Sequence, residues 1–81
     1  MRDDKRIFIK ECALYIKGQI SEVRMSGAKK NVELFSRVLS ESRKFYLALQ
    51  EGDIENVLPQ LAKKRDASRA LREQTGYVWP L

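Results

Sequence analysis

Apolar residues recur at intervals of three and four along most of this 81-residue chain. An α-helix turns by about 100° per residue, so this spacing places them on one side of a helix. No segment alternates apolar and polar residues between turn signals, as a half-buried strand would. We therefore predict an all-α protein made of three helical segments.

The first helix is expected over about residues 4–25. Its apolar stripe consists of Ile9, Cys12, Ala13, Ile16, Ile20 and Val23. Gly18 lies opposite this stripe and weakens a helix by about 1 kcal/mol relative to alanine. The stripe nevertheless continues through Gly18 in phase, which favours one helix that ends at the Ser26-Gly27 pair.

The second helix is expected over about residues 29–51, and its broad apolar face is typical of a central helix with two neighbours. Gly52 is the expected terminator, and Asp53 the cap of the third helix. Pro59 removes a helical hydrogen bond wherever it lies past the first turn. We therefore expect a short turn over residues 54–58, followed by a helix over 59–75.

Both connections are short on this interpretation, and short connections make neighbouring helices antiparallel. The predicted architecture is an up-down-up antiparallel three-helix bundle over residues 1–76. Residues 77–81 form an apolar C-terminal tail that contains Trp79, the single tryptophan. The tail either folds back to complete the small core or exposes Trp79 as an anchor for a partner.

The third helix changes character along one face. The positions of Leu58, Leu61 and Ala62 are followed on the same side by three arginines, Arg65, Arg69 and Arg72.

With 16 Lys and Arg against 11 Asp and Glu, the net charge is +5, which favours anionic partners. In an up-down-up bundle the arginines would share one end with Lys29 and Lys30. The helix dipole accounts for cations at a helix C-terminus, but it disfavours Lys29 and Lys30 in a first turn. The candidate partner-binding residues are therefore the cations of this end, Arg65, Arg69, Arg72, Lys29 and Lys30, together with Trp79 of the tail.

A second candidate surface lies opposite the main stripe of the first helix. It consists of Ile7, Leu14 and Met25. Single exposed apolar residues are normal, but a small monomer has difficulty burying so many. We therefore predict that the chain self-associates through these residues, as a homo-oligomer such as a dimer.

Catalysis has little support in the sequence. The chain has no histidine and a single cysteine, Cys12, so no zinc site and no activated thiol are expected. The glycines are isolated rather than gathered in a phosphate loop. We expect no enzyme activity, no cofactor and no metal.

The N-terminus is charged, and no apolar run reaches the roughly 20 residues of a membrane span. The expected location is therefore the cytoplasm.

Together these features favour a non-enzymatic helical module for protein–protein interaction, an adaptor or regulator, that presents a basic end to an acidic partner. A small basic nucleic-acid-binding regulator that uses the third helix is one alternative, because this helix mixes cations with Gln60, Ser68 and Gln74. A structural subunit of a larger assembly is the other.

Overall fold

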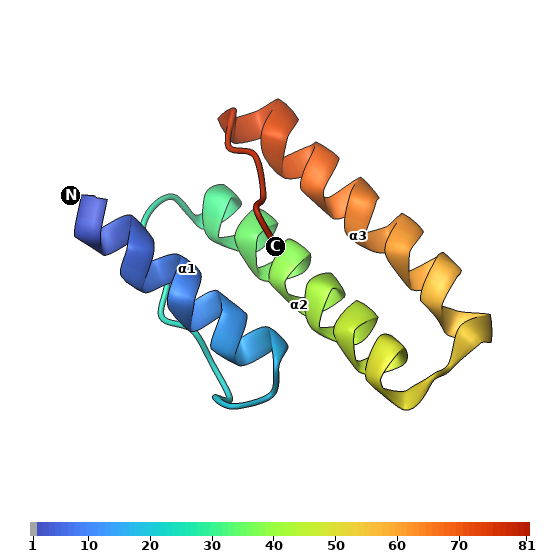
Figure 1. Cartoon of the computed structure of the whole chain (residues 1–81). Helices are drawn as coiled ribbons and strands as arrows, with labels where there is room; N and C mark the ends of the chain where they lie inside the picture. Colours follow the sequence, from blue (N-terminus) through green and yellow to red (C-terminus); the bar gives the residue numbers. More distant parts are fainter. Residues whose placement is uncertain (1) are drawn as a thin grey trace.

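The computed structural model describes residues 2–81, with side chains from residue 5 onward. It contains three helices, α1 (Arg2–Ile16), α2 (Lys29–Glu51) and α3 (Ile54–Thr75), and the described residues form no strand (Figure 1). The helices pack into one globule with α2 between the other two. The predicted all-α fold with a central second helix is confirmed.

The first helix is shorter than its apolar stripe predicts. Gly18 has a φ of 79°, and the Gly18 and Gln19 N–H groups donate to the carbonyls of Tyr15 and Leu14, at 3.0 and 2.9 Å. This pattern is the Schellman motif that ends a helix with a left-handed residue. The expected single helix to residue 25 is therefore wrong: residues 17–28 are a connection, in which Val23 still packs against the core.

This longer connection changes the direction of α1. Phe8, in the first half of α1, packs edge-on against Phe35, near the start of α2. Tyr15, at the end of α1, contacts Arg43, two turns further along α2. The two helices therefore run parallel, whereas the up-down-up arrangement required them to be antiparallel (Figure 1). Residues 17–28 can span about 40 Å when extended, more than the roughly 22 Å length of α1, so the chain can return to the starting end.

The second junction is short and reverses the chain, as predicted. Gly52 has a φ of 68°, and the Gly52 and Asp53 N–H groups donate to the carbonyls of Leu49 and Ala48. Helix α3 then begins at once and runs antiparallel to α2 (Figure 1). Pro59 lies inside α3 rather than at its start, which corrects the expected break. Its missing hydrogen bond falls near the exposed beginning of the helix, where solvent can satisfy the free carbonyl.

The C-terminal tail, residues 77–81, completes the core. It leaves α3 after Gly76 and folds back across the face of α2, between α1 and α3 (Figure 1). Trp79 is only 9% exposed and joins a cluster of buried residues from all three helices. This cluster consists of Cys12, Ile16, Val38, Leu39, Ala67, Leu71 and Trp79. Of the two alternatives for the tail, the structure has the packed one.

Candidate functional site: a basic groove between α3 and the tail

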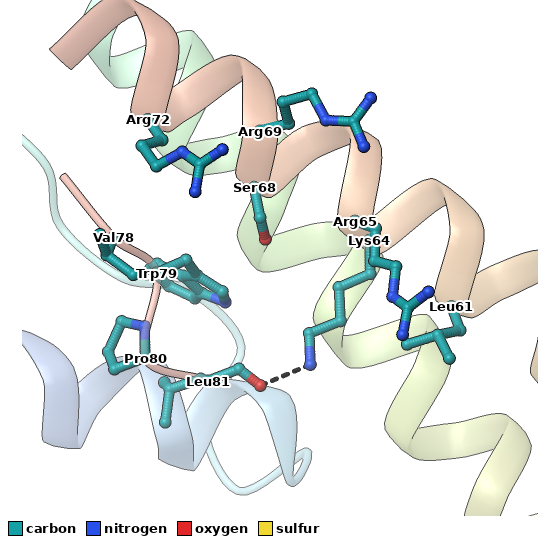
Figure 2. A pocket seen from close by; sticks show the side chains of 10 residues that line it. All are labelled: Leu61, Lys64, Arg65, Ser68, Arg69, Arg72, Val78, Trp79, Pro80 and Leu81. Atoms are coloured by element: carbon teal, nitrogen blue, oxygen red, sulfur yellow. Dashed lines mark hydrogen bonds between the residues drawn. The ribbon is translucent and has the colours of Figure 1, made fainter. Parts of the chain in front are cut away.

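A groove of about 650 Å³ separates α3 from the C-terminal tail. One wall is a face of α3, and the other is the tail, whose Val78 side chain is 68% exposed. We call this feature the basic groove; its lining residues are Leu61, Lys64, Arg65, Ser68, Arg69, Arg72, Val78, Trp79, Pro80 and Leu81 (Figure 2). Four of the six predicted partner-binding residues lie here: Arg65, Arg69, Arg72 and Trp79.

The three arginines of the basic groove are exposed and lie on successive turns of α3. Arg72 extends toward the tail and Arg65 toward Leu61, whereas Arg69 points away from the tail (Figure 2). Among residues 5–81 the single ion pair joins Lys44 to Glu41, so none of these arginines has a carboxylate partner there. The groove therefore offers unneutralised guanidinium groups, which bind carboxylate and phosphate oxygens well.

Two hydrogen bonds between the helices and the tail hold the floor of the groove. The buried indole Nε1 of Trp79 donates to the Oγ of Ser42 on α2, at 3.0 Å. The Lys64 ammonium donates to the backbone oxygen of Leu81, at 2.6 Å, and lies 5.2 Å from the centre of the Phe45 ring. Burial lowers the pKa of Lys64. Trp79 therefore supports the groove from below and is not an exposed anchor.

The remaining predicted cations, Lys29 and Lys30, do not line the groove. They lie exposed in the first turn of α2, which has no acidic residue and no side-chain cap. Because α2 and α3 are antiparallel, this turn shares an end of the molecule with the last turn of α3 (Figure 1). Helix α1 also begins at that end of the molecule (Figure 1). The Asp3 and Asp4 side chains of its first turn lie outside the described residues.

The residues expected to mediate self-association lie in two different elements. Ile7 is 55% exposed on α1, and Leu14 is half-buried. Met25 is not on α1: it lies in the connection, packs against the core, and accepts a weak hydrogen bond from the Ser36 hydroxyl at 3.7 Å. Self-association through these residues stays a prediction that a single chain does not test.

Several residues of the groove were not among the predicted partner-binding residues. Lys64 and Ser68 carry a detectable signal, because Leu61, Lys64, Ser68 and Arg72 are spaced as one side of a helix. Val78, Pro80 and Leu81 carry no such signal. Their position depends on how the tail docks, which is a contact between residues far apart in the sequence.

Cys12 is fully buried, and burial, with a smaller contribution from the Glu11 carboxylate, raises the pKa of its thiol to about 11. It thus behaves as a small apolar side chain. The part of the chain that the structure describes holds no group of three potential metal ligands. Nor does any of its helices combine the length and apolar character needed to cross a membrane.

Comparison with known proteins does not assign this site: no family model, no curated protein and no solved structure matches the chain.

Proposed function

We propose that the protein is a non-enzymatic helical interaction module, an adaptor or regulator, that binds an acidic segment of a partner protein in the basic groove. The observation that carries this proposal is the combination of the two walls. Arg65, Arg69 and Arg72 have no carboxylate partner among residues 5–81, and they line the same groove as Val78 and Leu81 of the tail. Such a mixture of arginines and apolar side chains is typical of protein interfaces.

Nucleic acid is the alternative partner, since phosphates also bind arginine. The apolar wall favours a peptide, because a phosphate backbone has no apolar side chains to place against Val78, Pro80 and Leu81. The groove also lacks an aromatic platform for base stacking, as its Trp79 ring is buried. In this proposed role the protein acts in the cytoplasm, the location expected from the sequence.

The test measures binding to a fluorescent glutamate-rich peptide at physiological salt, where charges further apart than about 8 Å are screened. Replacing Arg65, Arg69 and Arg72 by glutamate is expected to weaken binding by at least about tenfold, through loss of direct charge pairs. The matched control replaces Lys5, Lys10 and Lys17, which are exposed outside the groove, by glutamate. It has the same net charge and is expected to retain most of the affinity.

Two outcomes contradict the proposal. Equal losses in the two variants would show a general charge effect rather than a groove. Tighter binding of a DNA duplex than of the peptide by the unmodified protein, lost in the arginine variant, would favour the nucleic-acid alternative.

A further inference from the structure

The face of α3 that forms the groove wall extends beyond the groove. Its residues follow a strict alternation of four and three positions, which is the heptad spacing of a face that packs on another helix. We call this face the α3 seam; it consists of Ile54, Leu58, Leu61, Arg65, Ser68 and Arg72. The seam covers almost the whole of α3, with an apolar first half and a polar, mainly basic second half.

In the part of the chain that the structure describes, no element covers Ile54 and Leu58 in the apolar half of the seam. Ile54 is 82% exposed and Leu58 is 71% exposed, the two highest values among the large apolar residues of the described chain. Single exposed apolar residues need no explanation. These two are neighbours on one helical face and lead directly into a groove, which is the pattern of a binding surface.

Helix α2 carries a further exposed apolar residue, next to the end of the tail. Ser42, Phe45 and Leu49 lie on one stripe of α2, at spacings of three and four. Trp79 of the tail covers Ser42, and the tail ends at Leu81. The backbone oxygen of Leu81 accepts a hydrogen bond from the Lys64 ammonium, which lies over the Phe45 ring. Leu49 is the next residue along the stripe, beyond the end of the tail, and it is 52% exposed.

We infer that the ligand of the groove is an amphipathic α-helix with one acidic and one apolar half, which packs along the α3 seam. This inference rests on the proposed function and names the chemistry of its partner. The acidic half would face Arg65 and Arg72, and the apolar half would cover Leu58 and its neighbours.

The seam sets the length of this ligand. It rises about 27 Å from Ile54 to Arg72, so the ligand helix has about five turns. Acidic residues stabilise the first turn of a helix through its dipole. The acidic half therefore comes first, and the ligand runs antiparallel to α3.

Charge complementarity selects this occupant over a second copy of the chain. The chain carries a net charge of +5, and the seam of a second copy contains no acidic residue. A parallel two-fold pairing of the seams would place arginines against arginines, and an antiparallel pairing would place them against Leu58 and Ile54. The tail of the same chain is also excluded, because it is already bound in the other half of the face (Figure 2).

The experiment uses two synthetic peptides of identical composition. The first has glutamates in its first half and leucines at heptad positions in its second half, whereas in the second the leucines are scattered around the helix. The full-length protein is expected to bind the ordered peptide at least about tenfold more tightly, because buried leucines contribute only when they share one side. Binding should also increase the helical circular dichroism signal of the ordered peptide.

Two variants locate the bound peptide. Replacing Ile54 and Leu58 by serine is expected to abolish the preference for the ordered peptide, while Ile7→Ser, at an exposed apolar residue of α1, should preserve it. Equal affinities of the unmodified protein for the two peptides would overturn the inference, as would a preference that survives in the Ile54 and Leu58 variant. Either result leaves the proposed function standing if the arginine variant still loses binding of the glutamate-rich peptide.

Discussion

The two halves of the face that α2 presents between α1 and α3 differ in what covers them. In the first half Trp79 of the tail packs against Phe35 and is hydrogen-bonded to Ser42, and Val38 and Ser42 are 0% and 2% exposed. In the second half the same face continues to Leu49, which the tail does not reach. The two halves of this face carry similar side chains. Burial along the face therefore depends on the position of the tail and not on the amphipathic pattern of α2.

This difference separates stability from binding. The covered half holds the residues that form the core, and substitutions there should lower the free energy of unfolding. The open half lies beside the basic groove, and substitutions there should change binding alone. The following predictions test this separation.

The largest effect is expected at Trp79. Replacing Trp79 by alanine should lower the free energy of unfolding by about 3–5 kcal/mol, because it removes a large buried ring and leaves a cavity. Chemical denaturation followed by circular dichroism measures this loss. Ser42→Ala is the matched control for the hydrogen bond alone, and it should cost about 1–2 kcal/mol by leaving the indole N–H unpaired. A neutral effect of Trp79→Ala would show that the tail does not cover the core in solution.

An intermediate effect is expected at alkaline pH. Burial raises the pKa of the Cys12 thiol from 9.0 to about 11, so the folded state favours the protonated form. Its contribution to stability is therefore complete below pH 9 and is lost as the pH rises toward 11. The loss should be of the order of 1–3 kcal/mol, from about 1.4 kcal/mol per unit of pKa difference.

The measurement compares unfolding free energies between pH 8 and pH 11 in the unmodified protein and in Cys12→Ala. The variant should be less stable at pH 8 because of its cavity, and its stability should fall less steeply above pH 9. Parallel curves for the two proteins would contradict the expected role of the thiol.

The smallest effect is expected in the open half. Leu49→Ser and Leu58→Ser should each change the free energy of unfolding by no more than about 0.5 kcal/mol, since these side chains are already largely exposed. The same denaturation experiment measures them. A loss comparable to that of Trp79→Ala would show that the two halves do not differ, and that an unseen contact covers the second.

The local features of the fold follow from the sequence. The spacing of apolar residues predicts three helices, and Gly52 and Gly76 predict the ends of α2 and α3. The arginines of α3 lie on the side that helical periodicity assigns to them. These properties depend on residues within one or two turns of each other, so a pattern in the sequence is sufficient to find them.

The direction of α1 and the docking of the tail were decided by the tertiary structure alone. Gly18 could either continue a helix in phase or end it, and the choice depends on contacts of Val23 and Met25 with a core that only the folded chain provides. In the same way, the basic groove exists because the Trp79 indole N–H of the tail donates a hydrogen bond to the Ser42 hydroxyl of α2. Such contacts between distant residues must outweigh the conformational entropy of ordering a loop or a tail, and no local pattern in the sequence encodes that balance.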